Sequence, residues 1–205
     1  MFFAFDGLDG VGKSTQQRLF IEWLEQQGYN VKTCRDPGST PLGEKLRDIL
    51  LEKSSLEIHA RTEMLLYMAA RSQLVEEVIR PAQAAGQMII SDRFLLANIA
   101  YQAYGGEMSP EAVRQVGQVA VNGSMPDATF LLDMPCKLSF ARLDRQLDRM
   151  ESKGLEYMER VRQGFLEEAK LLENVFVLDA TQDIDTIQQQ IRSVAEKLLK
   201  GTSSS

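Results

Sequence analysis

The stretch Phe2-Phe3-Ala4-Phe5-Asp6-Gly7-Leu8-Asp9-Gly10-Val11-Gly12-Lys13-Ser14-Thr15 joins a short apolar run to a glycine-rich loop. The run from Phe2 to Phe5 is too short for a helix and is apolar on both faces, which is typical of a buried strand. From Gly7 to Ser14 the sequence matches the spacing G-x-x-x-x-G-K-[ST], and a segment with helical periodicity follows. A strand, this loop and a helix in this order predict a phosphate-binding loop.

The chemistry expected of this loop follows from its residue types. Glycines let consecutive backbone N–H groups point at a phosphate, and the helix N-terminus adds its dipole. Lys13 would supply a cation to the β- and γ-phosphates of ATP, Ser14 a hydroxyl to Mg²⁺, and Thr15 a contact with the α-phosphate. The predicted nucleotide-binding residues are Gly7, Leu8, Asp9, Gly10, Val11, Gly12, Lys13, Ser14 and Thr15.

The loop alone does not name the reaction, because GTPases, motor ATPases and small-molecule kinases share it. The sequence has no N-K-x-D segment of the kind that selects guanine, and 205 residues leave little room for the accessory modules of a motor. A compact P-loop kinase is therefore the leading class.

Beyond the loop, short apolar runs alternate with longer segments of helical spacing. The further runs are Val31–Cys34, Met88–Ser91, Thr129–Asp133 and Val175–Leu178. The helical segments are Lys13–Gln27, Leu42–Glu52, Arg61–Ala85, Pro110–Val121, Lys137–Arg149, Leu155–Leu172 and Ile184–Leu199. This alternation predicts an α/β fold of the three-layer P-loop NTPase type, with five buried parallel strands flanked by helices. We expect one domain over residues 1–200 and a disordered tail over 201–205.

Composition excludes several other classes. Hydrophobic residues make up 44% of the chain, charged residues 25%, and the net charge is −6, so a broad basic face for nucleic acid is not expected. Cys34 and Cys136 are the only cysteines, and neither a signal peptide nor an eighteen-residue apolar run occurs. The single His59 rules out a multi-histidine metal site. We expect a cytoplasmic protein with neither nucleic-acid nor membrane partners.

A second anion site is predicted where the third apolar run ends. Asp92 and Arg93 follow Ser91 and should emerge at the carboxyl edge of the sheet, beside the loop. The carboxylate can hold Mg²⁺ with its waters, and the guanidinium can clamp a second phosphate. The alternative is that Asp92 and Arg93 form a simple ion pair at the strand end. The adjacent phosphate-binding loop favours the anion site over this alternative.

Glu63, Tyr67 and Arg71 share one helix face, at positions i, i+4 and i+8. An aromatic ring one turn from a guanidinium can stack on a base while the guanidinium bonds the base carbonyl. From the spacing alone, a core tyrosine beside a salt-bridged arginine explains the pattern better.

The motifs taken in order resemble those of the bacterial thymidylate kinases. They cover nearly the whole chain at Gly7–Thr15, Arg35–Gly43, Glu63–Arg71, Val75–Ala82, Asp92–Phe94, Ala100–Gln102, Pro126–Asp127, Leu131–Asp133, Asp148–Glu151 and Asp179–Gln182. The resemblance implies a five-stranded parallel sheet, a homodimer, and Mg²⁺-dependent transfer of the γ-phosphoryl of ATP to dTMP, giving dTDP for dTTP synthesis.

The resemblance also implies roles for single residues around dTMP. Tyr67 would stack on thymine and Arg71 would donate to its O4. Arg93 would hold the dTMP phosphate, helped by Arg35 or Arg47.

Four further residues would complete the dTMP site. Asp9 would contact the sugar 3′-hydroxyl, and Tyr101 would lie under the deoxyribose, leaving no room for a 2′-hydroxyl. Asn98 and Gln102 would line the base pocket. A fifth residue, Asp36, matches the acidic position of the family's R-E-P-G-G stretch, and Ser39 stands where that stretch has its second glycine.

A lid over about residues 142–154 is the last expected part. Arg142, Arg145 and Arg149 lie at i, i+3 and i+7 and would form one stripe if the segment is helical. The resemblance implies a lid that brings arginines to the transferring phosphoryl group, with Arg145 and Arg149 favoured. A solvated charged face is the alternative. The predicted catalytic residues are Lys13, Asp92, Arg93, Arg142, Arg145 and Arg149, and the predicted metal ligands are Ser14 and Asp92.

Two competing functions remain open at this point. One is a small P-loop kinase for another nucleoside monophosphate or for a nucleoside, which would need a carboxylate base for its neutral hydroxyl. The other is a P-loop protein that uses ATP as a switch and transfers nothing.

Overall fold

The computed structural model describes residues 1–52, 56–144 and 146–202. Its five strands are β1 (Phe2–Asp6), β2 (Val31–Arg35), β3 (Met88–Asp92), β4 (Ala128–Asp133) and β5 (Val175–Asp179). All paired strands are parallel, in the order β2-β3-β1-β4-β5. The predicted α/β fold is confirmed, and each strand lies within one residue of its predicted bounds.

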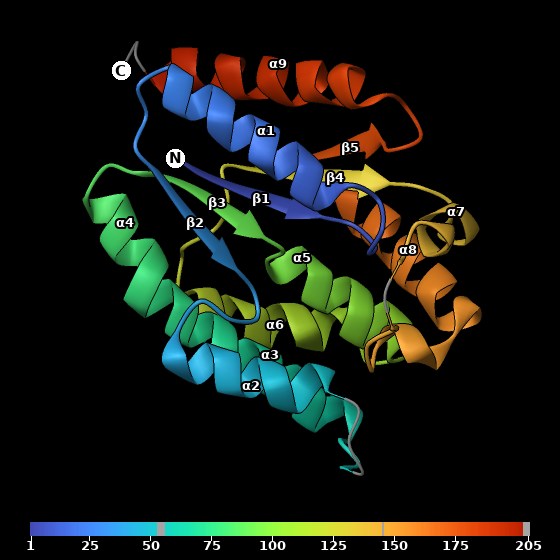
Figure 1. The fold of residues 1–205 in the computed structure, drawn as a ribbon. Coiled ribbons are helices and arrows are strands. Elements are labelled where there is room, and N and C mark those ends of the chain that lie inside the picture. The colour runs from blue at the N-terminus through green and yellow to red at the C-terminus, as the bar shows by residue number, and fades with distance from the viewer. Residues whose placement is uncertain (53–55, 145, 203–205) are drawn as a thin grey trace.

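Helices cover both faces of this sheet (Figure 1). They are α1 (Lys13–Gln26), α2 (Pro41–Leu51), α3 (Ala60–Leu74), α4 (Arg80–Ala84), α5 (Leu95–Asn98), α6 (Pro110–Val121), α7 (Cys136–Ala141), α8 (Leu155–Ala169) and α9 (Ile184–Thr202). Two π-helical segments, η1 (Val75–Ile79) and η2 (Ile99–Gly105), and a 3₁₀ turn, η3 (Glu151–Lys153), complete the described elements. Helices α1 and α9 lie on one face, and α3 to α6 lie on the other (Figure 1). No described helix combines the length and apolarity needed to cross a membrane.

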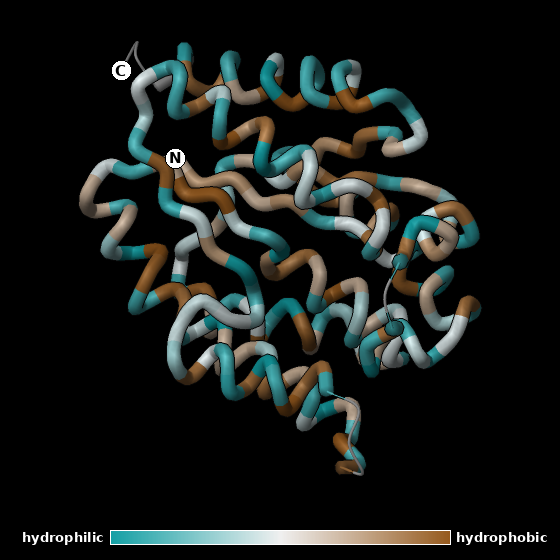
Figure 2. Tube along the Cα trace, in the orientation of Figure 1, coloured by the Kyte–Doolittle hydropathy of each residue, from teal (hydrophilic) through white to brown (hydrophobic). Residues whose placement is uncertain are grey.

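The core lies on both faces of the central strands. Phe3 and Phe5 pack with Phe20 of α1 and Phe130 of β4 on one face. Helix α9 turns hydrophobic residues toward the same face (Figure 2). On the other face, Phe2 meets Phe94 edge to face at 5.0 Å.

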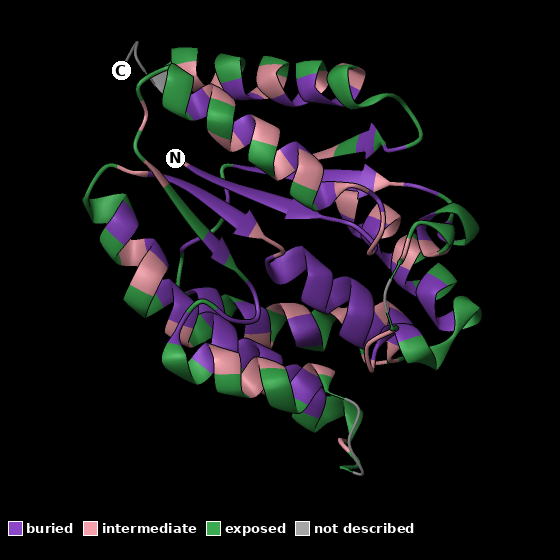
Figure 3. Cartoon of the chain, in the orientation of Figure 1, coloured by how far each residue is buried: buried purple, intermediate pink, exposed green. Residues whose placement is uncertain are grey.

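The expectation that all five strands are buried was wrong for two of them. β1 and β4 are buried almost throughout, whereas β2 and β5 carry several exposed residues (Figure 3). The strand order gives the reason, because β2 and β5 form the two edges of the sheet.

Four helical segments differ from the sequence prediction. The predicted helix Arg61–Ala85 is divided into α3, η1 and α4, and α5 with η2 was not among the predicted helices. The predicted helix Lys137–Arg149 ends at Ala141, and no helix occurs among described residues 142–150. α9 continues through Thr202, so the expected disordered tail was wrong at 201–202, and 203–205 lie outside the described residues.

Candidate active site

The loop between β1 and α1 depends on glycine at two close approaches. Gly7 has φ 129°, and a Cβ there would lie 2.3 Å from the carbonyl oxygen of Leu132. At Gly10, φ is 81° and a Cβ would lie 2.2 Å from the carbonyl oxygen of Ser139. Any side chain would therefore push the loop away from β4 and α7. The glycines keep the loop at the carboxyl edge of the sheet, directly before α1.

Lys13 points back into this loop. Its Nζ donates to the carbonyl oxygens of Gly7 at 3.2 Å and Leu8 at 2.8 Å, and to Oδ1 of Asp9 at 3.2 Å. Burial lowers the pKa of Lys13, and the neighbouring Arg93 cation adds to the effect. The ammonium group is thus held where the phosphates of a nucleotide would enter the loop.

Arg93 reaches the same loop from the end of β3. Its φ of 66° is unusual for an arginine, and its backbone N–H donates to the carbonyl of Phe5 at 2.8 Å. The guanidinium donates to the Gly7 carbonyl and to Oδ1 of Asp9, both at 2.8 Å. It also lies over the Tyr101 ring, 5.3 Å from its centroid. The predicted phosphate clamp therefore stands beside the predicted cradle.

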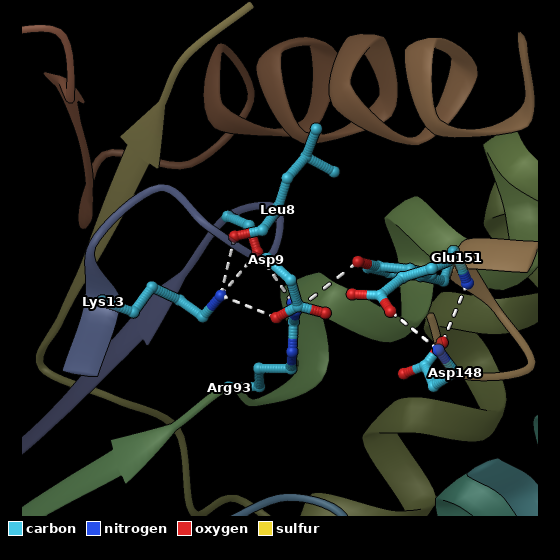
Figure 4. Close-up of polar contacts among 8 residues, drawn as sticks. Leu8, Asp9, Lys13, Arg93, Asp148 and Glu151 are labelled. Carbon is cyan, nitrogen blue, oxygen red and sulfur yellow. Dashed lines mark hydrogen bonds and ion pairs between the residues drawn. The ribbon is translucent and has the colours of Figure 1, made fainter. Parts of the chain in front are cut away.

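Asp9 joins the two cations. Burial alone would raise the pKa of Asp9, but Arg93 and Lys13 hold it well below its usual range. Carboxylate oxygens of Asp9, Asp148 and Glu151 all lie within 4.8 Å of one another, and Figure 4 shows the three side chains together. Sequence reasoning quoted Asp148 and Glu151 within a motif but assigned them no site role, because their approach to the loop is a long-range contact.

A cavity opens next to this centre, and every predicted dTMP-binding residue lines it. They are Asp9, Arg35, Asp36, Arg47, Tyr67, Arg71, Arg93, Asn98, Tyr101 and Gln102. The remaining lining residues are Pro37, Leu51, Asp92, Ala97, Asp148 and Met150. The cavity draws on segments from the loop after β1 to the chain beyond α7, so the fold brings together residues that the sequence places far apart.

Arg71 forms a buried ion pair and also lines the cavity. Its Nε donates to Oδ2 of Asp36 at 2.6 Å, with both side chains buried, and the guanidinium lies 5.2 Å from the centroid of the Phe94 ring. Burial raises the pKa of Asp36, and the Arg71 cation opposes that shift. The arginine is therefore salt-bridged in the core, as the simpler interpretation expects, and it also lines the cavity.

The arginines of the expected lid do not form one stripe. Arg142 is exposed directly after α7, and Arg145 lies outside the described residues. Arg149 turns away from the loop: its Nε donates to the Leu50 carbonyl at 2.6 Å, and its guanidinium also pairs with Glu63. The helical stripe was wrong because the chain after Ala141 leaves the helical path to reach α2.

The residues expected to hold Mg²⁺ fit a hard cation. Oδ1 of Asp92 is buried and has no hydrogen-bond partner among the described residues. Ser14 lies in the first turn of α1, immediately after Lys13. A carboxylate and a hydroxyl at one sheet edge are oxygen donors of the kind that Mg²⁺ prefers.

Comparison with known proteins decides the family. The model of the family described as thymidylate kinase matches residues 5–191. The chain belongs to the thymidylate kinase family. It is 47% identical to the thymidylate kinase of Rhodopirellula baltica, over 92% of this chain and 77% of that one. With the thymidylate kinase of Thermosipho africanus the identity is 43%, over 98% and 100% of the two chains.

A solved structure agrees with these relatives. The crystal structure of thymidylate kinase from Ehrlichia chaffeensis superposes with a TM-score of 0.76 at 30% identity, and the match covers 96% of this chain and 98% of that one. Membership of the thymidylate kinase family also bears on Ser39, whose φ of 62° is a backbone conformation that favours the glycine expected there.

Proposed function

We propose that the protein is a dTMP kinase that transfers the γ-phosphoryl group of ATP to dTMP, giving dTDP and ADP for dTTP synthesis. The observation that carries this proposal is the shared use of Asp9 by Lys13 of the loop and Arg93 of the cavity. It supports a donor phosphate and an acceptor phosphate held side by side. Family membership supports dTMP as the acceptor.

The reaction requires charge neutralisation more than proton removal. The second pKa of a phosphomonoester is about 6, so the dTMP phosphate is already largely dianionic at neutral pH and needs no general base. The difficulty is to bring two polyanions together. Lys13 would bind the β- and γ-phosphates, and Arg93 would exchange Asp9 for the dTMP phosphate.

Mg²⁺ belongs to the proposal as the metal of the ATP site. Ser14 and Asp92 would hold it, Asp92 directly or through water. When bound, the ion neutralises charge on the β- and γ-phosphates. The remaining loop residues would contact ATP through their backbone N–H groups.

The base and sugar would occupy the cavity. Tyr67 would stack on thymine, Arg71 would donate to O4, and Asn98 and Gln102 would contact the base. Tyr101 is buried, with the Phe165 ring edge-on at 6.1 Å, which supports a fixed wall under the deoxyribose.

Further charged side chains would complete the contacts with phosphate and sugar groups. Arg47 donates to the Pro37 carbonyl at 2.9 Å at the cavity wall, and with Arg35 it would assist at the dTMP phosphate. Asp9, once released by Arg93, would accept from the 3′-hydroxyl. Of the lid arginines, Arg142 and Arg145 would approach ATP, whereas Arg149 would need to leave Glu63 to do so.

We also propose a homodimer in the cytoplasm, with neither membrane nor nucleic acid as a partner. Exposed apolar side chains on α2 and α3, namely Leu42, Ile49 and Leu65, support helix packing between subunits. The charge of −6 supports the absence of a nucleic-acid partner.

The test is ADP release with Mg-ATP and, in turn, dTMP, dUMP, dCMP, UMP, thymidine and no acceptor. We expect strong release with dTMP and weaker release with dUMP, because a methyl group in an apolar pocket is worth about 1–3 kcal/mol. The other acceptors should stay near background. Preference for another acceptor would overturn the base assignment, and ATP binding without acceptor-dependent release would indicate a switch protein instead.

A further inference from the structure

Glu63 is a buried acid that has no role in the function proposed above. It lies in α3, is 4% exposed, and is bonded on both of its oxygens. Oε1 accepts from Nε2 of Gln102 at 3.1 Å. Oε2 pairs with the Arg149 guanidinium, and Nζ of Lys153 lies 3.5 Å away. These contacts connect the base cavity with the chain that follows α7.

A carboxylate fixes the direction of the hydrogen bonds beyond it. An ionised glutamate only accepts, so Gln102 must turn its NH₂ group toward Glu63. Oε1 of Gln102 then faces the other way, and it accepts from Nδ2 of Asn98 at 2.7 Å. Asn98 keeps its second N–H and its carbonyl oxygen, and Oδ1 is the atom that is buried with no partner within the described part of the chain. Asn98 and Gln102 both line the base cavity.

We propose that Glu63 is a positioning residue that sets the hydrogen-bond polarity of the base cavity through Gln102 and Asn98. The relay makes Asn98 present an acceptor, which suits a pyrimidine whose ring nitrogen N3 carries a hydrogen, as in thymine and uracil. Cytosine places an unprotonated N3 there, and two facing acceptors leave a buried group unsatisfied. The inference rests on the proposed function, because it concerns which nucleotide that same site accepts.

Arg149 and Lys153 have a defined part in this relay. Both cations lie at Oε2 of Glu63, whereas Oε1 accepts from Nε2 of Gln102. By holding Oε2, the two cations fix the orientation of the Glu63 carboxylate. The segment from Arg149 to Lys153 therefore contributes to base selection, although neither cation lines the cavity.

The test compares dTMP with 5-methyl-dCMP, which keeps the methyl group but changes N3 and the group at C4. In the Glu63→Gln variant the new amide can donate or accept, so Gln102 and Asn98 are free to reverse. We expect the ratio of kcat/KM for dTMP over 5-methyl-dCMP to fall at least about tenfold. Part of the wild-type ratio comes from Arg71 at C4 and should remain. The dTMP-to-dUMP ratio should not change, because the relay does not touch the methyl group.

Two further variants separate polarity from packing. The double exchange Glu63→Gln with Gln102→Glu restores an acceptor next to Asn98. The new amide at position 63 can donate to the new carboxylate at position 102, and that carboxylate can accept from Asn98. This double variant should recover the dTMP preference. Glu168→Gln is the matched control, because Glu168 is also buried and paired with an arginine, but its hydrogen bonds are to Arg114 and Tyr104 rather than to Gln102. It should leave the ratio unchanged.

The wild-type protein supplies a test that needs no variant. A 3-deaza analogue of dTMP, in which C–H replaces N3–H and C4 therefore carries a hydroxyl group, should lose at least about tenfold in kcat/KM, because the contacts of Asn98 and Arg71 both change. Equal use of this analogue overturns the relay, and so does a Glu63→Gln variant that slows all acceptors equally. Turnover of dTMP itself tests the proposed kinase function, so that function and the role proposed for Glu63 can fail separately.

Discussion

The donor loop and the acceptor cavity are built in opposite ways. The loop is one stretch of nine residues, 7–15, whose shape follows from glycines and from the strand and helix at its ends. The cavity is lined by residues from Asp9 to Met150, drawn from several elements. Local sequence therefore determines the loop, whereas packing over long sequence distances determines the cavity.

The contacts that hold the two regions differ in kind. In the loop, Lys13 mostly contacts backbone carbonyls. Around the cavity, ion pairs connect separate elements, with Arg71 of α3 bonded to Asp36 after β2, and Glu63 of α3 bonded to Arg149. A change in the loop should therefore affect the reaction more than stability, and a change in an ion pair of the cavity should affect both.

Lys13→Ala should give the largest effect and leave the fold intact. Loss of the cation on the transferring phosphates should lower kcat by about 100-fold to 1,000-fold or more. Asp9 keeps Arg93 as its partner, so no buried charge is left alone. Steady-state kinetics and thermal unfolding would measure the two quantities, with exposed Lys32→Ala as the control. Near-normal turnover, or a large fall in Tm, would contradict the view that the loop serves the reaction more than stability.

Asp36→Ala should act mainly on stability. The substitution leaves the Arg71 guanidinium buried and unpaired, which costs about 3–5 kcal/mol in the free energy of unfolding. Urea unfolding would measure it. Glu44→Ala is the control, because its pair with Arg35 is largely exposed, at 51% and 40% for Arg35 and Glu44, and should contribute about 0–1 kcal/mol. Equal losses of unfolding free energy in the two variants would show that a buried ion pair contributes no more to stability than an exposed one.

The same contrast explains what the sequence could predict. The five strands were predicted correctly. The ten residues expected around dTMP all line one cavity. This set could be predicted because the family resemblance indicates which distant residues come together, which spacing alone does not. The helical path after Ala141 was predicted wrongly, because local periodicity carries no information about the bond from Arg149 to the Leu50 carbonyl. The relay through Glu63 was missed for the same reason, since helix spacing places Glu63 beside Tyr67 but not beside Gln102 or Arg149.

Asp6, directly before the loop, has a pKa that depends on burial and on distant charged residues as well as on local sequence. It ends β1 directly before Gly7, is 0% exposed, and neither carboxylate oxygen has a partner among the residues that the structure describes. Burial raises the pKa of Asp6 to about 7, although Arg93 and Lys13 oppose the shift. Between about pH 4 and 7 the folded protein therefore keeps a proton that the unfolded chain has released. Stability should fall as pH rises through this window.

The Asp6→Asn variant should remove this dependence. Between pH 5 and pH 7 the wild type should lose about 2–3 kcal/mol relative to the variant, by the linkage of about 1.4 kcal/mol per pH unit. Urea unfolding of both proteins at pH 5, 6, 7 and 8 would measure the difference, in which other titrating groups cancel. The difference should level off above pH 7, once Asp6 is ionised in both states. A wild type that gains stability over the variant as pH rises would mean that Asp6 is paired and ionised, and that the loop, like the cavity, is held by an ion pair with a distant residue.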